Sequence, residues 1–257
     1  SVPNIMKVIN PLFLDELKIE FENSKGNAKK LNELHKRITN LKIFDPACGS
    51  GNFLIIAYKK LRELEMSILK RIDVLSGQMS FAFSEIKLTQ FYGIELDDFA
   101  HEVAMLSLWL AEHQMNLEFY KAFGRTSPSL PLQNGGNIVH GNATRLDWEE
   151  VCPKNVGDEI YILGNPPYLG SSMQNKEQKI DKDLIFKGIK NYKNLDYIAC
   201  WFYIGAKYIK SINAKLALVS TNSICQGEQT NLLWPEILKS IEMHFAYQSF
   251  EWKNNAK

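Results

Sequence analysis

The segment FDPACGSGNF (residues 44–53) follows the short apolar run LKIF (41–44) and leads directly into a long helical pattern. A buried strand, a glycine turn and a helix in this order are typical of the first unit of a doubly wound α/β fold, whose ligand binds where the strand ends. Gly49 and Gly51 allow the backbone to turn tightly and to approach a ligand closely. The segment lacks the third glycine of GxGxxG and the GK[ST] of a P-loop, so it indicates neither a dinucleotide nor a nucleoside triphosphate.

Further runs of strand length alternate with helical patterns along the chain. The predicted strands are LKIF (41–44), TQFYGIEL (89–96), NIVHGN (137–142), EIYILG (159–164), KLALVSTN (215–222) and EMHFAYQSF (242–250), and the predicted helices cover 53–71, 99–116, 196–210 and 228–240. This alternation predicts an α/β fold with a doubly wound, mostly parallel, Rossmann-like sheet over residues 41–257. Residues 1–40 have amphipathic helical spacing and are predicted to form an N-terminal helical extension.

The composition of the 257-residue chain is that of one large globular domain, with 45% hydrophobic and 23% charged residues. Its net charge of +1 gives no overall basic field, although a neutral protein can still carry a basic binding face. No apolar run is long enough to span a membrane, and no signal peptide is recognisable. Because the chain begins with Ser1 and stops within SFEWKNNAK, we expect a fragment of a longer protein.

The cysteines are scattered along the chain, at Cys48, Cys152, Cys200 and Cys225. Because none of them forms a CxxC pair, their spacing argues against a zinc site and against a disulfide framework. We therefore expect no metal site and a reducing, cytoplasmic setting.

Side chains suited to binding a ligand stand at the ends of the first three predicted strands. Asp45 ends the first strand and can hold a cationic group, and Glu95 ends the second, where an acidic side chain takes ribose hydroxyls in doubly wound folds. Leu96 can lie against a flat base, and the Asn142 amide can read an adenine edge. Glu95 also has a structural explanation as a helix cap or a solvated charge, and Asn142 has one as a turn asparagine. Together they indicate a nucleoside with a charged tail and no phosphate clamp, which S-adenosylmethionine (SAM) fits better than NAD or ATP.

The sequence LGNPPYLG (163–170) forms a rigid loop directly after a predicted buried strand. Pro166 and Pro167 fix their own φ angles, lack N–H donors and restrict the residues before them. The loop therefore presents carbonyl oxygens, the Asn165 amide oxygen and the Tyr168 ring to whatever lies above the sheet. A flat partner with N–H donors would suit these groups, and a rigid loop without chemistry is the structural alternative.

Five segments occur in the order found in one enzyme family: FDPACGSGNF, GIELDD, GNPPY, LDYIACW and KLALVSTNSI. With these motifs the sequence resembles the gamma-class amino-methylating DNA methyltransferases, and most closely the methyltransferase segment of single-chain type IIG/IIL restriction–modification enzymes. The resemblance covers most of the chain, from Leu41 to the end. It implies the class I SAM-dependent methyltransferase fold and double-stranded DNA, with adenine as the methyl acceptor. It also implies further domains of the parent chain: a target recognition domain beyond residue 257 and, if the parent cuts DNA, a nuclease.

The resemblance assigns catalysis to Asn165, Pro166, Pro167 and Tyr168. The exocyclic amine of adenine is a poor nucleophile because its lone pair is delocalised into the ring. If the Asn165 amide oxygen and the Pro166 carbonyl accept its N–H bonds, the nitrogen is drawn toward tetrahedral geometry and its lone pair is aimed at the methyl group. Tyr168 would stack on the target base, which has to be flipped out of the duplex to reach the loop.

The resemblance assigns cofactor binding to residues in three segments: Asp45, Pro46, Ala47, Cys48, Gly49, Gly51, Asn52, Phe53, Glu95, Leu96 and Asn142. Many family members have aspartate where this chain has Asn142. The family also contacts the cofactor upstream of the first strand, and INPLF (9–13), which departs from the usual Thr-Pro pattern, is the candidate here. Asp196 matches a motif that helps to hold the cofactor or the catalytic loop, with a helix N-cap as the alternative. Phe250 and Trp252 lie where the family packs an aromatic residue on the flipped base.

A polar stretch that follows the proline loop and extends to Asn194 is rich in lysine: Lys176, Lys179, Lys182, Lys187, Lys190 and Lys193 stand against Glu177, Asp181 and Asp183. Because this stretch leaves the proline loop directly, it can lie along a phosphate backbone. A solvated surface loop is the alternative.

Other functions share parts of this pattern. Methylation of the cytosine amine more often uses serine in place of Asn165, and methylation of a protein glutamine amide shares the NPPY motif. A non-catalytic fragment that binds SAM or DNA also stays open. An NAD-dependent dehydrogenase shares the fold but would need GxGxxG and gives no reason for the proline loop. The sequence therefore predicts a SAM-dependent, adenine-specific DNA methyltransferase of a restriction–modification system.

Overall fold

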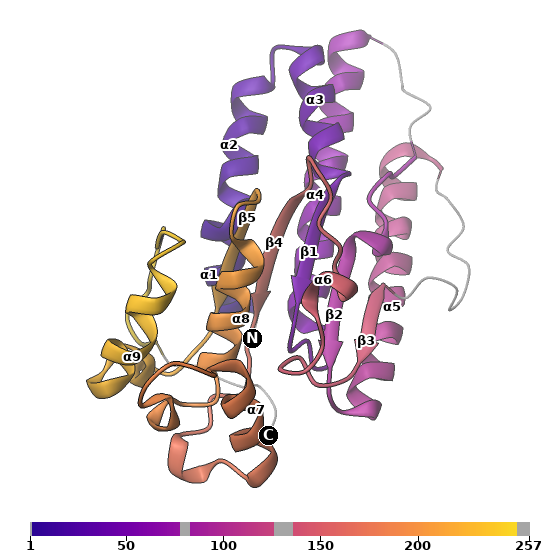
Figure 1. Ribbon diagram of the computed structural model, residues 1–257. Helices are drawn as coiled ribbons and strands as arrows, with labels where there is room; N and C mark the ends of the chain where they lie inside the picture. The colour runs from indigo at the N-terminus through magenta and orange to yellow at the C-terminus, as the bar shows by residue number, and fades with distance from the viewer. Residues whose placement is uncertain (1, 78–82, 126–135, 251–257) are drawn as a thin grey trace.

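The computed structural model describes residues 2–77, 83–125 and 136–250, which form an α/β body around a five-stranded sheet (Figure 1). The strand order is β3-β2-β1-β4-β5, with bounds β1 Leu41–Asp45, β2 Phe91–Glu95, β3 Asn137–His140, β4 Glu159–Gly164 and β5 Ala214–Leu218. Each neighbouring pair of these strands is parallel. The predicted doubly wound α/β fold is thus confirmed.

The order of the strands reverses between β1 and β4. From β1 the chain continues to β2 and β3 on one side, and it then returns to lay β4 on the other side of β1, where Leu41 pairs with Glu159 and Ile43 with Tyr161. In open α/β sheets, ligands bind in the crevice outside the carboxyl ends of the strands at such a switch point. The carboxyl ends of β1 and β4 are therefore the expected binding edge.

Helices cover both faces of the sheet (Figure 1). One face carries α4 Asn52–Ser76 and α5 Asp98–Phe123, together with the N-terminal helices α1 Val2–Ile9, a π-helical turn at Asn10–Leu14, α2 Asp15–Ser24 and α3 Ala28–Ile38. The other face carries α6 Trp148–Val151, α8 Ala199–Ile209 and α9 Gly227–Ile237. Because both faces are covered, the strands are near-continuous apolar runs, and this pattern made them recognisable in the sequence.

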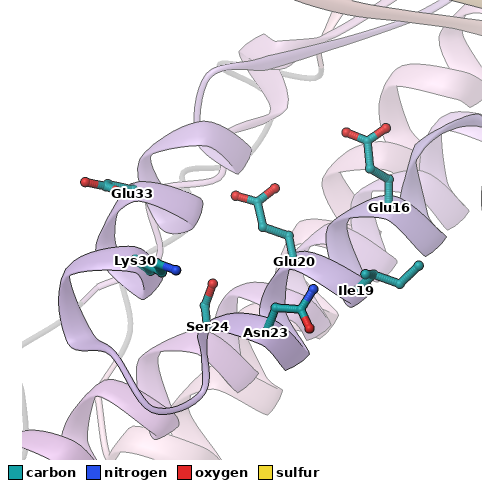
Figure 2. Close-up of a pocket in the computed structure, with 7 residues that line it drawn as sticks. All are labelled: Glu16, Ile19, Glu20, Asn23, Ser24, Lys30 and Glu33. Carbon is teal, nitrogen blue, oxygen red and sulfur yellow. The ribbon is translucent and has the colours of Figure 1, made fainter.

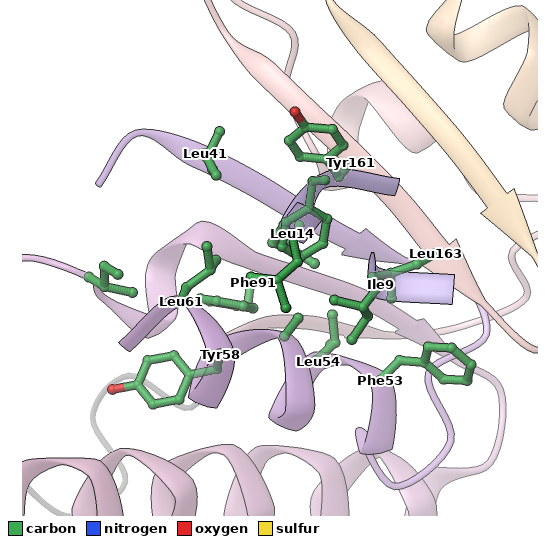
Figure 3. Packing of buried hydrophobic residues seen from close by; sticks show 14 of the residues in the cluster. Ile9, Leu14, Leu41, Phe53, Leu54, Tyr58, Leu61, Phe91, Tyr161 and Leu163 are labelled. Carbon is green, nitrogen blue, oxygen red and sulfur yellow. The ribbon is translucent and has the colours of Figure 1, made fainter. Parts of the chain in front are cut away.

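The core beneath α4 also contains residues of the N-terminal helices (Figure 3). Leu54, Tyr58 and Leu61 follow one another at helical spacing on one side of α4 and are fully buried. Ile9 and Leu14 belong to the same hydrophobic cluster and are also fully buried. Full burial of such a side chain contributes roughly 1.5–3 kcal/mol. The first helices therefore share one core with the sheet.

Arg37, at the end of α3, ties the N-terminal helices to the amino-terminal edge of the sheet. Its guanidinium donates to Glu159, the first residue of β4, at 2.9 and 2.7 Å, and to Glu16 of α2 at 2.6 Å. Hydrogen bonding to Glu159 and then to Glu16 raises the pKa of Arg37 above its ordinary value. This charge cluster fixes α2 and α3 at the end of β4 that is opposite the binding edge.

The groove in Figure 2 lies between α2 and α3 and has a volume of about 410 Å³. Its lining consists of Glu16, Ile19, Glu20, Asn23, Ser24, Lys30 and Glu33. Glu16 and Glu20 both contact Arg37, so this groove belongs to the amino-terminal edge of the sheet and not to the binding edge.

Two segments differ from the predicted secondary structure. The expectation of a sixth strand at EMHFAYQSF (242–250) was wrong, since these residues have no regular structure. The alternating pattern there has no neighbouring strand within the described residues to supply a hydrogen-bonding ladder, and most of its side chains are exposed. The polar stretch before Asn194 contains a helix, α7 Lys176–Ile185, which starts with a capping box formed by Asn175 and Gln178.

The cysteines are free thiols, of which Cys48, Cys152 and Cys200 are buried and Cys225 is exposed. Burial raises the pKa of the Cys48 and Cys200 thiols, so both stay protonated and pack as small apolar groups. Among the described residues, no helix combines the length and the apolar character needed to cross a membrane.

Candidate active site

The carboxyl ends of β1, β2 and β4 bring the predicted motifs together at one edge of the sheet, the lower edge in Figure 1. Asp45 is the last residue of β1, Glu95 is the last residue of β2, and Asn165 follows the last residue of β4. The register places Asp45 beside Gly93 of β2. Residues that are far apart in the sequence thus meet at the switch point.

The glycine loop after β1 is held open by two left-handed residues. Gly49 has a φ of +53° and Gly51 a φ of +83°, a region that L side chains rarely adopt. Gly51 is the N-cap of α4, and a Cβ on it would lie 3.5 Å from Ala104 of α5. The loop therefore keeps its backbone close to the sheet and leaves the start of α4 accessible, with Asn52 exposed.

Glu95 supports the glycine loop from the neighbouring strand. Its carboxylate accepts a hydrogen bond from the Gly49 N–H at 2.7 Å and another from the Asp97 N–H at 2.9 Å. The Cys48 N–H donates to the Ile94 carbonyl at 3.1 Å beside it. A carboxylate has about four acceptor positions, so Glu95 keeps the capacity to accept ribose hydroxyls while it holds the loop.

Asp45 is a buried carboxyl group with one unpartnered oxygen. Its Oδ1 accepts the Ala47 N–H at 3.0 Å, while Oδ2 is buried without a hydrogen-bond partner. Burial, together with the charge of Glu95, raises the pKa of Asp45 to about 8, against the hydrogen bond from Ala47. A cationic group placed against Oδ2 would complete this site and reverse the shift.

The proline loop is fixed at both ends. The Gly164 carbonyl accepts the Val219 N–H at 2.9 Å, and the Leu169 carbonyl accepts the Tyr197 N–H at 2.8 Å. Between these anchors, the Asn165 Oδ1 is buried and has no hydrogen-bond partner. The loop thus holds a rigid, unsatisfied amide oxygen at the binding edge.

The other residues of the proline loop differ in exposure. Pro166 is buried, whereas Pro167 is exposed. Tyr168 is 41% exposed, which leaves it accessible to a flat partner. Leu96, the residue predicted to lie against the cofactor's base, is 65% exposed at the end of β2.

Asn142 follows β3 and its amide is oriented by its neighbours. Its Oδ1 accepts hydrogen bonds from the Thr144 N–H at 2.9 Å and from the Thr144 hydroxyl at 2.6 Å. Its Nδ2 donates to Asp181 of α7 at 3.2 Å. The oxygen is thus occupied, and the second N–H is the group that Asn142 has left to offer an adenine ring nitrogen.

Asp181 is buried at this edge of the sheet. In the sequence it was noted only as one of the acidic residues in the lysine-rich stretch. Besides Asn142, its carboxylate accepts from Arg145 at 2.7 Å and from the Tyr197 hydroxyl at 2.8 Å. Although burial raises the pKa of Asp181, the hydrogen bonds from Arg145 and Tyr197 lower it below its usual value. Asp181 therefore stays ionised and joins α7 to the loop after β3 and to the segment just before α8.

Residues at the start of α8 hold both loops. The Trp201 indole N–H donates to the Pro46 carbonyl at 3.0 Å, which anchors the glycine loop. The Asp196 carboxylate accepts from Ser223 at 2.7 Å and from Gln229 at 3.4 Å, and the α8 N-cap is Ile198, so Asp196 is not the helix cap. The backbone N–H of the neighbouring Tyr197 donates to the Leu169 carbonyl and so anchors the proline loop.

The lysines predicted to face phosphate divide into two groups. Lys182 is buried, and its ammonium donates to Gln174 at 2.9 Å and to the Lys193 and Leu195 carbonyls at 3.0 and 2.5 Å. It is therefore structural. The remaining side chains are exposed on and after α7: Lys176, Lys179, Lys187, Lys190 and Lys193.

The candidates near the two ends of the chain, residues 9–13 and Phe250, lie next to α1. INPLF spans the π-helical turn, and the Asn10 Oδ1 is buried there without a hydrogen-bond partner. The Lys7 ammonium lies 3.9 Å from the centroid of the Phe250 ring. Trp252 lies outside the described residues. The roles assigned to these residues stay predictions.

Comparisons with known proteins show which family the chain is similar to. The family model for the DNA-methyltransferase domain of MmeI matches residues 21–257. DNA methyltransferase A of Bacillus subtilis (strain 168) is 56% identical over 259 aligned residues, which cover 100% of this chain and 29% of that protein. The type II restriction enzyme and methyltransferase RM.Eco57I of Escherichia coli is 27% identical over 179 residues, covering 62% of this chain and 18% of the relative.

One solved structure is similar over nearly the whole chain. It is the type IIL restriction–modification enzyme MmeI in complex with DNA, with a TM-score of 0.85 and 42% sequence identity, covering 92% of this chain and 32% of that chain. The chain thus spans about a third or less of the length of these relatives.

Proposed function

Because the chain belongs to the family of MmeI DNA-methyltransferase domains, we propose that it transfers a methyl group from SAM to the exocyclic amine of adenine in double-stranded DNA. The reaction would serve a restriction–modification system, as the names of its relatives indicate for those proteins. The observation that carries the proposal is the buried Asn165 Oδ1, which is rigidly held at the switch point and has no partner.

The residues at the binding edge fit SAM. The buried and unpartnered Asp45 Oδ2 suits a cationic group of the cofactor, and Gly49 and Gly51 keep side chains away from its tail. Glu95 retains acceptor capacity for ribose hydroxyls, and Asn142 retains a donor for the adenine ring. Pro46, Ala47, Cys48, Asn52, Phe53 and Leu96 complete the set of residues that we assign to cofactor binding. When bound, SAM supplies an electrophilic methyl group.

Asn165 and Pro166 act on the target amine. The Asn165 Oδ1 accepts one N–H of the amine and the Pro166 carbonyl accepts the other, which draws the nitrogen out of conjugation with the ring. Because both acceptors are fixed before the base arrives, little reorganisation is needed at the moment of reaction. The proton can leave after attack, so the loop needs no strong base.

Pro167 and Tyr168 prepare the loop for a flipped base. Pro167 keeps the backbone rigid, and the partly exposed Tyr168 ring offers a stacking surface to a base outside the duplex. Stacking of a base on an aromatic side chain is worth about 1–3 kcal/mol, which offsets part of the cost of unpairing.

The exposed lysines on and after α7 support DNA as the partner. They follow the proline loop in the chain, and lysines contact phosphate oxygens without regard to sequence. Reading of a specific sequence would come from further domains of the parent chain: a target recognition domain and, if the parent cuts DNA, a nuclease. A cytoplasmic setting, expected from the cysteines, suits an enzyme that acts on DNA.

The test uses the protein as its gene encodes it, methyl-labelled SAM and mixed-sequence DNA that is afterwards digested to nucleosides. We expect label on adenine alone. The Asn165→Ala variant should transfer no label but bind SAM as the parent protein does, whereas Asn32→Ala, which alters an exposed asparagine on α3, should leave transfer unchanged.

The other outcomes would decide against adenine. Label on cytosine would favour the cytosine-amine reaction, and labelled protein beside unlabelled DNA would favour glutamine methylation. If Asn165→Ala lost SAM binding to the same extent as methyl transfer, the role assigned to that residue would be contradicted.

A further inference from the structure

Two histidines meet beside the binding edge, outside the residues assigned to methyl transfer. His101 lies in the first turn of α5 and His140 is the last residue of β3, and their ring centroids are 5.9 Å apart. The His101 Nε2 is 3.2 Å from the Ile138 carbonyl, and the His140 Nε2 is 3.0 Å from the Leu96 carbonyl. A carbonyl oxygen can only accept, so each Nε2 carries the proton that it donates.

This arrangement fixes the tautomer of both rings. When Nε2 is protonated in a neutral imidazole, Nδ1 holds a lone pair. The other ring nitrogen of a metal-binding histidine commonly donates to a backbone carbonyl or a carboxylate in this way, which fixes the ring orientation. Both Nδ1 atoms are thus prepared to accept a cation.

Two carboxylates face these nitrogens. The Asp98 Oδ1 is 3.9 Å from the His140 Nδ1, and the Glu102 Oε1 is 3.3 Å from the His101 Nδ1. One ligand atom each from Asp98, His101 and Glu102 lies within 4.8 Å of the others. Acidic residues at a helix start are common, but here two oriented imidazoles stand among them.

The His101 Nδ1 is a buried ligand atom without a hydrogen-bond partner. The His101 side chain is only 12% exposed, and its Nδ1 is inaccessible to solvent. The Glu102 Oε1 lies 3.3 Å from this nitrogen without forming a hydrogen bond to it. A metal ion between the two atoms would bind both and give the Nδ1 lone pair the partner that it lacks.

We propose that Asp98, His101, Glu102 and His140 bind one divalent transition metal ion, with Zn²⁺ as the best match. Imidazole nitrogen and carboxylate oxygen are zinc ligands at about 2.0–2.2 Å, which separates neighbouring ligand atoms of a tetrahedron by roughly 3.4 Å. The separations of 3.3 Å between His101 and Glu102 and of 3.9 Å between Asp98 and His140 lie near this value. His140 stands outside the group whose ligand atoms all lie within 4.8 Å of one another, so its ring has to turn toward the other three residues to complete the site.

The bound ion would connect the start of α5 with the end of β3 at the binding edge. The His140 ring also holds the Leu96 carbonyl, and Leu96 is assigned to the cofactor's base. The metal would thus stiffen the segment between β2 and α5 without touching the atoms that react. The site stands on its own geometry and does not depend on the proposed methyl transfer.

The test uses the full protein encoded by the gene, from which bound metal has been removed with a chelator. The protein is titrated with Zn²⁺ in a calorimeter and, in a separate experiment, with Co²⁺ while visible absorption is recorded. The variants are His140→Ala and Glu102→Gln. The controls are His113→Ala and Glu118→Gln, which change exposed residues of the same helix away from the cluster.

We expect one equivalent of Zn²⁺, the intense visible bands of tetrahedral Co²⁺, and binding at least about tenfold weaker in both variants but not in the controls. A rise in the thermal midpoint with Zn²⁺ should be lost in the same variants. If Zn²⁺ bound equally in the variants and the controls, or if no equivalent bound, the site would be refuted.

Discussion

The carboxyl group of Asp45 lies directly against the backbone of Gly164: a Cβ built on Gly164 would be 2.5 Å from the Asp45 Oδ1 and 3.2 Å from its Cγ. The last residue of β1 thus contacts the last residue of β4, immediately before Asn165. The glycine loop and the proline loop are not structurally independent, since they share this contact.

Gly164→Ala should therefore impair both loops. Asp45 is buried and cannot move away, so the added methyl group forces the strand ends apart at a cost of about 1–3 kcal/mol. We expect a lower free energy of unfolding in urea, weaker SAM binding and little methyl transfer. Gly26→Ala is the matched control, because nothing lies within 4 Å of its added Cβ. Full activity of Gly164→Ala would show that the contact has no functional weight.

Asp45→Asn should change how stability depends on pH. The folded-state pKa of Asp45, about 8, is raised above the unfolded value, so its contribution to stability is complete below about pH 4 and is lost as the pH rises through 8. The loss amounts to about 1.4 kcal/mol per pH unit in that window. We expect the neutral amide to remove this dependence, so the variant should gain stability over the parent between pH 5 and pH 9 in urea unfolding.

The same variant should bind SAM less well, and by a factor that grows with pH. Ionised Asp45 attracts the cationic cofactor, and its fraction increases toward pH 8 in the free protein. SAM binding is measured by calorimetry for both proteins at pH 6 and at pH 8. The ratio of the two affinities at each pH removes any effect of the cofactor's own titration. Equal affinities at both values would mean that Asp45 does not face the cofactor's charge.

Asn142→Asp should be harmful here, although many family members have aspartate at this position. The new oxygen would replace the Nδ2 that now lies 3.2 Å from the buried Asp181 carboxylate, so two like charges would meet. We expect weaker SAM binding and lower stability. Adding Asp181→Asn should restore part of both, and a double-mutant cycle measures this recovery. Additive losses would argue against a direct contact.

The pair Lys187→Gln and Lys190→Gln should weaken DNA binding for all sequences alike. Each phosphate contact that is lost reduces the slope of log K against log salt by about 0.9. Both side chains are exposed after α7, and replacing Lys29 and Lys36, which are exposed on α3, serves as the control. Binding measured from about 50 to 200 mM salt should show a smaller slope in the first pair alone. An unchanged slope would leave these lysines as ordinary surface residues.

The sequence was sufficient to predict the five strands that form the sheet and the position of the loops, although it also predicted a sixth strand that is not there among the described residues. Buried parallel strands are apolar along their length, and their carboxyl ends share one edge, so Asp45, Glu95 and Asn165 could be expected to meet there. The family resemblance and the comparisons agree on the identity of the domain. The roles of the individual site residues stay predictions.

Other features depend on contacts that no local pattern reveals. The hydrogen bond between Asn142 and Asp181 joins the loop after β3 to α7. The polar composition of α7 gave no clear helical pattern in the sequence, although the capping box of Asn175 and Gln178 could have marked the start of the helix. The segment 242–250 has an alternating pattern but no neighbour to pair with among the described residues. His101 and His140 belong to different elements, and a search based on cysteine spacing could not find them.

The pairing of β1 with β4 also constrains how the chain can fold as it is made. β1 can pair with β2 soon after both leave the ribosome, but Leu41 has to wait for Glu159 before the centre of the sheet is complete. Closing so long a loop is slow, and until then the exposed edge of β1 is open to wrong partners. The glycine loop lacks the Gly164 backbone and the Trp201 indole that hold it until both have been made, so the two loops reach their final arrangement together and only after residue 201 has left the ribosome.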